Sequence, residues 1–355
     1  MHLSRKSVVR TDLWLSPAFE ERLAHEADID LEICPVRAPV DKARALLAHA
    51  HAFHVSPAKD ELPKHLIVDD AFLEHCPHLL VVSSAGAGYD TVDAAACTRA
   101  GVLLVNQAGG NAVSVAEMAI GLMLAVSRRI VECDSRMRRE RGFPREEVMG
   151  YELAGKTVGL VGLGHTGQRV AGLARAFGMT VLAHDPYLDD AEIVRRGAQA
   201  ATLDALLERA DFVSLHCPRE RATLGMIDAA AFERMKRGAI FISTARGGIH
   251  DERALAAALS SGHLRGAGLD VWHPEPPELN NPLLAMDNVV ATFHTAGVTH
   301  EARRNVAHMG ALQIVGVFKG ERPPRLINPD VWPAYAARFA RIVGVAPASA
   351  ASPIA

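Results

Sequence analysis

The sequence predicts an α/β protein with parallel sheets flanked by helices. Two observations carry this prediction. Residues 156–185 run in order as strand, glycine-rich turn, helix, strand and acidic residue, which is the pattern of a βαβ unit. Short apolar runs also alternate with helical spacing on both sides of this stretch, and such alternation is typical of parallel sheets. With 355 residues, the chain is long enough for two domains.

The stretch from Lys156 to Asp185 supplies the strongest elements. Residues 157–161 form an apolar, β-branched run that predicts a buried strand. Residues 166–177 have the apolar spacing of a helix. A second apolar run, residues 180–184, predicts the next strand and leads directly to the acidic residue.

Three glycines and one carboxylate within this stretch predict a dinucleotide site. Gly162 allows the tight turn out of the strand, Gly164 lets backbone N–H groups approach a pyrophosphate, and Gly167 lets the helix pack closely. The anion would lie at the positive end of the helix dipole. Asp185 stands 18 residues after Gly167, where a carboxylate can accept both ribose hydroxyls of NAD and repel the 2′-phosphate of NADP. We therefore expect NAD as cofactor; the alternative is a turn that binds nothing.

The remaining elements follow along the chain. A helix is expected from Ser16-Pro17 to about Ala27, because serine and proline suit the N-cap and the first helical position. A long helix is expected from about Ser114 to about Glu140, with Ser114 and Glu117 forming a capping box. Apolar runs predict strands at residues 31–34, 52–55, 79–84, 101–106, 211–218, 238–248, 265–272 and 288–294, and helical patterns lie at 41–50, 69–75 and 299–319.

Composition argues against several classes of protein. Apolar residues make up 49% and charged residues 22% of the chain, as in soluble globular proteins. The net charge of −3 indicates no global basic surface for nucleic acid, and no uncharged apolar run is long enough to span a membrane. Five scattered cysteines without a CxxC pair indicate free thiols in a reducing cytoplasm. No group of histidines has the spacing of a metal site, so we expect no metal.

Three further motifs each stand just past an apolar strand. STARGG contains Arg246, LDVWHPEPP contains Asp270 and Glu275, and FHTAG contains His294. The planar guanidinium of Arg246 can bind the carboxylate and the carbonyl of a 2-keto acid together. His294 can give a proton to the carbonyl oxygen and take it back, and Glu275 would orient the imidazole and favour its protonated form. Each residue alone also has an ordinary interpretation, as a surface ion pair, a loop acid or a core histidine.

With these motifs in this order, the sequence resembles the D-specific 2-hydroxyacid dehydrogenases. That family includes phosphoglycerate dehydrogenases, glyoxylate/hydroxypyruvate reductases and D-lactate dehydrogenases. The resemblance covers roughly residues 50–320. It implies an NAD-dependent oxidoreductase in which Arg246, Glu275 and His294 are the catalytic residues.

The same resemblance implies further site residues. The backbone N–H groups of Ala87 and Gly88 stand where the family binds the substrate carboxylate, and the family usually has a larger apolar side chain than Ala87. Asp270 matches a position near the nicotinamide amide. His165 stands where the family often has an arginine beside the pyrophosphate. The expected cofactor residues are Gly162, Gly164, His165, Thr166, Gly167, Asp185, Cys217, Thr244 and Asp270.

The resemblance also implies two Rossmann-like domains. A substrate domain of residues 1–106 plus 298–355 would receive an inserted NAD-binding domain of residues 107–297. Family members are usually homodimers, with the helix after Ser114 and the loop near 141–151 in the interface. The expected substrates are 3-phosphoglycerate, hydroxypyruvate or glyoxylate, and the expected location is the cytoplasm.

Two alternatives stay open at this point. The chain could be a non-enzymatic NAD-sensing binding protein of the same fold, because such proteins can keep the catalytic residues. It could also be a formate or phosphonate dehydrogenase. The formate enzymes lack the acid at the position of Glu275, which disfavours that branch.

Overall fold

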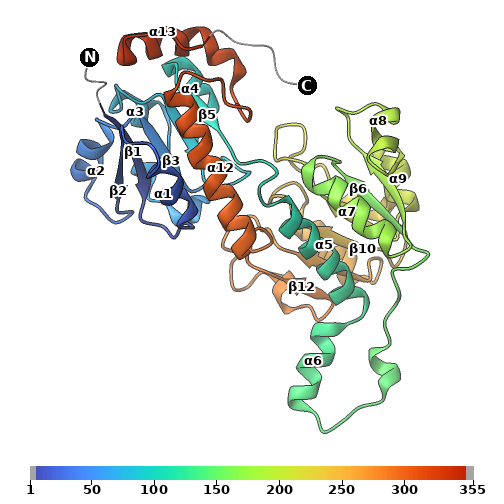
Figure 1. Cartoon of the computed structure of the whole chain (residues 1–355). Coiled ribbons are helices and arrows are strands. Elements are labelled where there is room, and N and C mark those ends of the chain that lie inside the picture. Colours follow the sequence, from blue (N-terminus) through green and yellow to red (C-terminus); the bar gives the residue numbers. More distant parts are fainter. Residues whose placement is uncertain (1–4, 349–355) are drawn as a thin grey trace. The chain divides into compact units, whose positions relative to one another are not determined.

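A computed structural model describes residues 5–348 of the chain (Figure 1). The described residues form two compact units, residues 5–111 with 299–348 and residues 112–298. Each unit has one parallel sheet with helices packed on it, so the expected fold class is confirmed. The second unit is an insertion between the two segments of the first. That the first unit binds substrate stays a prediction.

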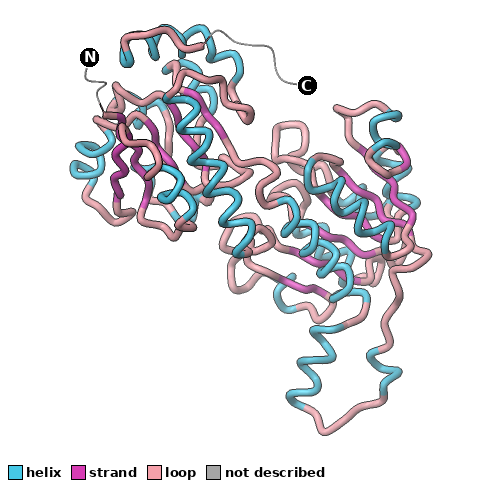
Figure 2. Tube along the Cα trace, in the orientation of Figure 1, coloured by secondary structure: helices cyan, strands magenta, loops and turns pink. Residues whose placement is uncertain are grey.

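The first unit contains a five-stranded parallel sheet in the order β2-β1-β3-β4-β5. Figure 2 shows the strands of the protein in magenta and the helices in cyan. Neighbouring residues of one strand face opposite sides, so Val8 packs into one apolar cluster with Ile314 while Val9 packs into another with Phe53. The strands are β1 (Lys6–Thr11), β2 (Ile29–Cys34), β3 (Ala52–Val55), β4 (Val81–Ser84) and β5 (Leu103–Val105). The helices are α1 (Ala18–Leu23), α2 (Val40–Leu47), α3 (Asp70–Glu74), α4 (Ala94–Ala100), α12 (His300–Phe318) and α13 (Trp332–Val343).

The second unit contains a seven-stranded parallel sheet in the order β12-β11-β10-β9-β6-β7-β8. The strand order reverses at β6, which pairs with β7 on one side and β9 on the other; ligands of such sheets bind outside the carboxyl ends of the strands at this point. The strands are β6 (Thr157–Val161), β7 (Thr180–His184), β8 (Gln199–Ala200), β9 (Phe212–Leu215), β10 (Ile240–Ser243), β11 (Gly266–Leu269) and β12 (Val289–Ala291). The helices are α5 (Ala112–Ser127), α6 (Ile130–Arg139), α7 (His165–Ala176), α8 (Asp190–Arg195), α9 (Leu203–Arg209), α10 (Ala229–Arg234) and α11 (Glu252–Ser260).

The expected long helix from Ser114 to Glu140 is wrong. Two helices, α5 and α6, take its place, and the chain breaks between them at Arg129, whose φ of 52° is left-handed. The physical reason is burial: α5 packs against the sheet of the second unit, whereas α6 has no buried residue. Ser114 lies inside α5, so the expected capping box with Glu117 is also wrong. In the first unit, α1 ends at Leu23, earlier than expected.

Strands β3, β6 and β7 have the bounds that the sequence predicts. Strand β1 and helix α13 were not expected. The α13 helix buries Tyr335 and Phe339. The guanidinium of its Arg338 donates hydrogen bonds to backbone carbonyls in the loop between α3 and β4 and at the end of α4. Those carbonyls belong to Cys76, Pro77, Leu79 and Ala100. Between residues 5 and 348, no helix combines the length and the apolar content that a bilayer crossing requires.

Candidate active site

The glycine turn after β6 is packed too closely for side chains at two positions. Gly162 has a left-handed φ of 93°, and a Cβ atom there would lie 2.7 Å from the backbone nitrogen of Cys217. A Cβ atom at Gly167 would lie 2.3 Å from the carbonyl oxygen of Gly162. Both positions therefore require glycine, the first for the turn and the second for the close approach of α7.

The third glycine of the turn leaves space open. A Cβ atom at Gly164 would meet no atom of residues 5–348 within 4 Å. Gly164 is also the N-cap of α7, and no side chain of the described residues caps this helix end. The first N–H groups of a helix need partners and carry partial positive charge. The turn therefore suits a pyrophosphate, and His165, the first residue of α7, is exposed beside it.

Asp185, at the end of β7, supports the same turn. One carboxylate oxygen accepts from the N–H of Leu163 at 2.9 Å, and the other accepts from the N–H of Tyr187 at 3.1 Å. The guanidinium of Arg196 donates to the carbonyl oxygen of Leu163 at 2.9 Å. Asp185 thus binds the N–H of Leu163, and Arg196 binds its carbonyl oxygen. Of these two residues, only Asp185 was singled out from the sequence.

Two expected cofactor residues lie at the carboxyl ends of strands β9 and β10. Burial raises the pKa of the Cys217 thiol to about 11, so this cysteine is protonated near neutral pH and acts as a small packing residue. Thr244 is buried, and its hydroxyl has no hydrogen-bond partner among the described residues. The adjacent backbone of Cys217 is the close neighbour of Gly162 noted above.

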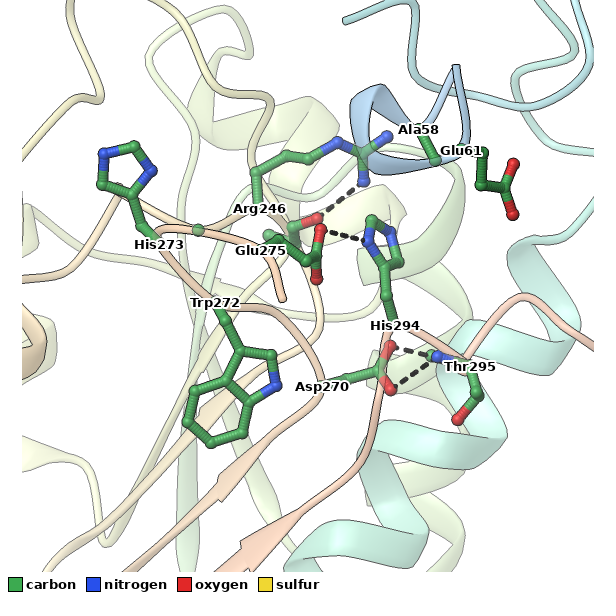
Figure 3. A network of polar contacts seen from close by, with 12 residues as sticks. Ala58, Glu61, Arg246, Asp270, Trp272, His273, Glu275, His294 and Thr295 are labelled. Atoms are coloured by element: carbon green, nitrogen blue, oxygen red, sulfur yellow. Dashed lines mark hydrogen bonds and ion pairs between the residues drawn. The ribbon is translucent and has the colours of Figure 1, made fainter. Parts of the chain in front are cut away.

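Arg246, Glu275 and His294 follow strands β10, β11 and β12, which are neighbours in the sheet. The carboxyl ends of parallel strands meet at one edge, so three motifs that are distant in sequence come together there. Figure 3 shows these three side chains grouped, with Asp270 and Thr295 beside them. The guanidinium of Arg246 donates to the carbonyl oxygen of Ala245 at 2.7 Å.

His294 and Glu275 form a hydrogen-bonded pair. The Nδ1 atom of His294 lies 2.9 Å from Oε2 of Glu275, and the two side chains are 37% and 24% exposed. The imidazole can therefore reach a substrate while the carboxylate fixes its orientation. His294 also has a left-handed φ of 48°, a conformation that non-glycine residues rarely adopt and that is held by surrounding structure at functional sites.

Asp270 is what holds the turn that carries His294. Its carboxylate is fully buried, and its carbonyl oxygen accepts from the N–H of His294 at 2.7 Å. Oδ1 accepts from the Thr292 hydroxyl at 2.6 Å and from the N–H of Thr295 at 2.9 Å, while Oδ2 accepts from the N–H of Ala296 at 2.9 Å. A contact between Asp270 and a nicotinamide amide stays a prediction.

Two residues that the sequence did not single out place the Arg246 and Glu275 segments side by side. A Cβ atom at Gly247 would lie 1.8 Å from the carbonyl oxygen of Trp272, so only glycine allows this approach. Glu252, at the start of α11, accepts from the N–H of His273 at 2.6 Å and from the side chain of Asn281 at 2.8 Å. The double glycine after Arg246 is the one sequence signal that could have indicated this contact.

Ala87 and Gly88 lie in the first unit, on the turn after β4. Their carbonyl oxygens accept hydrogen bonds from Asn106 Nδ2 at 2.7 Å and from Ser84 Oγ at 2.5 Å. Their own N–H groups have no acceptor within residues 5–348. Such adjacent free amides can bind an anion.

The second unit therefore has the fold and the turn of a dinucleotide-binding domain, with an arginine and a histidine–carboxylate pair at the same sheet edge. The chain belongs to the D-isomer specific 2-hydroxyacid dehydrogenase family. The NAD-binding domain of that family matches residues 120–296, so the expected family and cofactor are confirmed.

Similar proteins agree with this membership. D-3-phosphoglycerate dehydrogenase of Archaeoglobus fulgidus is 42% identical over 267 residues, which cover 75% of this chain and 50% of that protein. Glyoxylate reductase of Korarchaeum cryptofilum is 37% identical, with 74% and 80% covered. The chain thus spans about half the length of the phosphoglycerate dehydrogenases that it matches.

Solved structures show the same fold. The TT0316 protein of Thermus thermophilus has a TM-score of 0.80 with 30% identity, covering 90% of this chain and 99% of that one. D-lactate dehydrogenase of Aquifex aeolicus, in complex with NAD and lactic acid, has a TM-score of 0.77 with 26% identity, covering 90% and 99%.

Proposed function

We propose that this protein is an NAD-dependent oxidoreductase that interconverts a 2-keto acid and a D-2-hydroxy acid. The observation that carries the proposal is the His294–Glu275 pair, held at the sheet edge by the left-handed turn at His294. Family membership and the open glycine turn support a nicotinamide cofactor in the same unit.

The chemistry follows from the side chains. When bound, the cofactor supplies the hydride to the carbonyl carbon of the keto acid. His294 donates its proton to the carbonyl oxygen, and in the reverse direction takes it from the hydroxyl. Arg246 binds carboxylate and carbonyl with two parallel N–H groups, which holds the carbonyl polarised. Glu275 keeps the imidazole oriented and compensates its positive charge.

We propose substrates of the 3-phosphoglycerate, hydroxypyruvate or glyoxylate class, which the names of the relatives support. The test is oxidation of NADH with a panel of phosphorylated and unphosphorylated 2-keto acids. Turnover of at least one is expected. If the protein binds NADH but turns over none of these keto acids, the proposed enzymatic activity is refuted and a non-enzymatic NAD-binding protein is favoured.

We also propose a preference for NAD over NADP. The carboxylate of Asp185 stands at the end of β7, next to the glycine turn, and Arg196 is engaged on Glu192 and on the Leu163 carbonyl. A 2′-phosphate would meet the negative charge of Asp185. Comparison of kcat/KM for NADH and NADPH with one keto acid decides this, and equal values would refute it.

We further propose a homodimer. Helix α6 has no buried residue, and Ile130, Val131 and Met137 are at least half exposed on it. Figure 1 shows α6 and the loop after it extending from the sheet of the second unit. We call α6 and the loop after it, residues 130–151, the arm. A cavity of about 500 Å³ where the arm joins the rest of the second unit is lined in part by Val131, Met149 and Tyr151. A second copy of the chain would cover this apolar surface.

A further inference from the structure

The turn after β4 has its carbonyl groups engaged from one side. The carbonyl oxygen of Gly86 accepts from the backbone N–H of Gln107 at 2.8 Å, and that of Ala87 accepts from Asn106 Nδ2 at 2.7 Å. In a trans peptide the C=O of one residue and the N–H of the next point in opposite directions. The N–H groups of Ala87 and Gly88 are therefore turned away from Asn106 and Gln107.

The residues that hold this turn are themselves held. Gln313, from α12, donates to the side-chain oxygen of Gln107 at 2.8 Å and to the carbonyl oxygen of Asn106 at 2.9 Å. Its own side-chain oxygen accepts from the N–H of Arg325 at 3.2 Å. Asn106, Gln107 and Gln313 are 6%, 0% and 5% exposed. A buried, satisfied network of this kind leaves its members few alternative conformations.

A second contact from Gln107 strengthens the same arrangement. Its side-chain nitrogen donates to the carbonyl oxygen of Ser84 at 3.1 Å and to the hydroxyl of Ser83 at 3.2 Å. Ser83 is also bonded to His54 at 3.0 Å, and burial lowers the pKa of His54 to about 3. The network therefore carries no histidine charge near neutral pH, and its hydrogen-bond directions do not change there.

We propose that Asn106 and Gln107, fixed by Gln313, are positioning residues that aim the amides of Ala87 and Gly88 at the carboxylate of the keto acid. The inference rests on the proposed function and extends it to three residues outside the substrate contact. Two aligned N–H groups bind a carboxylate only if both peptide planes keep their orientation. Without the donor from Asn106, the peptide between Ala87 and Gly88 is free to rotate.

The test removes one donor at a time. Asn106→Ala removes the hydrogen bond to the carbonyl oxygen of Ala87. Gln313→Leu removes the hydrogen bonds that hold Asn106 and Gln107. KM for the keto acid and Kd for oxalate, a carboxylate analogue, should rise about tenfold or more in Asn106→Ala, because each amide bond to a charged group is worth a factor of this order. Gln313→Leu should give a smaller rise in both, and KM for NADH should stay within about twofold in each variant.

Asn328 offers a matched control. It is also 6% exposed in the first unit, and it bonds to the backbone of Leu104 and Val102, away from the turn. Asn328→Ala should lower the unfolding temperature by a similar amount without raising either constant. If Asn106→Ala leaves both constants unchanged, or if Asn328→Ala raises them equally, the positioning role is refuted.

The oxalate measurement separates this inference from the proposed function. If the wild-type protein turns over no keto acid, the function fails, yet oxalate binding still decides whether Asn106 orients the turn. If turnover is normal but the variants bind oxalate as tightly as the wild type, the function stands and the inference fails. If Asn106→Ala does not fold, the Gln313→Leu measurements decide.

Discussion

His294 combines an unusual backbone conformation with a carboxylate partner. Its left-handed φ is held by the hydrogen bond from its N–H to Asp270 and by the side-chain bond to Glu275. A left-handed conformation costs free energy for a residue with a side chain. The neighbouring turn supplies the offsetting bonds through the buried carboxylate of Asp270.

Arg246→Lys tests the two-point contact with the substrate. Lysine keeps the positive charge but has no planar fork. We expect kcat/KM for the keto acid to fall by the equivalent of about 2–4 kcal/mol, roughly 30- to 1000-fold, by analogy with loss of an oxyanion donor. Steady-state kinetics with both substrates varied provide the measurement. A kcat/KM close to that of the wild type would remove Arg246 from the mechanism.

Glu275→Gln tests the role of the carboxylate. The substitution removes the charge and keeps the size, so the protonated imidazole loses its electrostatic partner. Reduction takes its proton from the charged imidazole, and a hydrogen bond to a charged group is worth a factor of about ten or more. We therefore expect kcat/KM for the keto acid to fall by about tenfold or more, while KM for NADH changes little. Steady-state kinetics with both substrates varied check this, and a kcat/KM equal to that of the wild type would show that Glu275 only shapes its loop.

Elements of the second unit meet at contacts that allow no extra atoms. The turn after β10 touches the turn after β11 at Gly247 and Trp272, and the turn after β6 touches the start of α7 at Gly162 and Gly167. Backbone atoms line these contacts, and backbone cannot move aside as a flexible side chain can. The site depends on these approaches, because the first brings two strand ends together and the second places the start of α7 against the glycine turn.

Gly247→Ala should separate the Arg246 and Glu275 segments. The new Cβ atom would meet the Trp272 carbonyl at 1.8 Å, and we expect a loss of about 1–3 kcal/mol or more of unfolding free energy together with lower kcat. Gly172→Ala, inside α7 where a Cβ meets no atom within 4 Å, should instead stabilise the protein by roughly 0.5–1 kcal/mol. Denaturant unfolding and steady-state kinetics compare the two, and an unaffected Gly247→Ala variant would contradict the packing.

His250, which bridges to Ile227 after strand β10, makes stability depend on pH. Burial lowers its pKa to about 4 from 6.5. In the unfolded chain, His250 takes up a proton at its ordinary pKa of about 6.5. The free energy of unfolding therefore has its full value above about pH 6.5 and decreases as the pH falls toward the folded-state pKa. When the pH falls from about 7 to about 5, the free energy of unfolding should decrease by roughly 2 kcal/mol less in His250→Leu than in the wild type. Urea unfolding across this range measures the slope, with the exposed His308→Gln as a control that should match the wild type; equal slopes for His250→Leu and wild type would contradict the prediction.

On the scale of the whole molecule, the chain folds as two α/β units from three consecutive segments. The first unit needs both ends of the chain, because α12 and α13 return to its sheet. The second unit is continuous and carries the glycine turn together with Arg246, Glu275 and His294. The arm around α6 belongs to this second unit and leaves apolar side chains exposed.

The dimer prediction concerns that arm. Light scattering after gel filtration should give the mass of two chains for the wild type. The double variant Val131→Glu with Met137→Glu places charges on surface that a partner would desolvate, and we expect it to be monomeric. Val194→Glu on α8, where valine is 63% exposed, should stay dimeric. A wild type of one-chain mass would refute the proposal.

The sequence by itself determined the α/β class, strands β3, β6 and β7 to the residue, and the family. Fully buried parallel strands are continuous apolar runs, which can be recognised in the sequence. The turn after β6 accepts only glycine at positions 162 and 167, so the glycine motif can be recognised there too. The bend at Arg129, helix α13 and strand β1 were not visible, because burial against distant segments decides them.

The tertiary structure alone decided which polar groups meet. Asp270 supports the turn of His294, Gly247 touches Trp272, and Gln313 supports Asn106. These contacts join residues that are up to about two hundred positions apart, and a hydrogen bond requires its two atoms within about 3 Å. Only the folded chain sets such distances, since spacing along the sequence says nothing about which strand ends become neighbours.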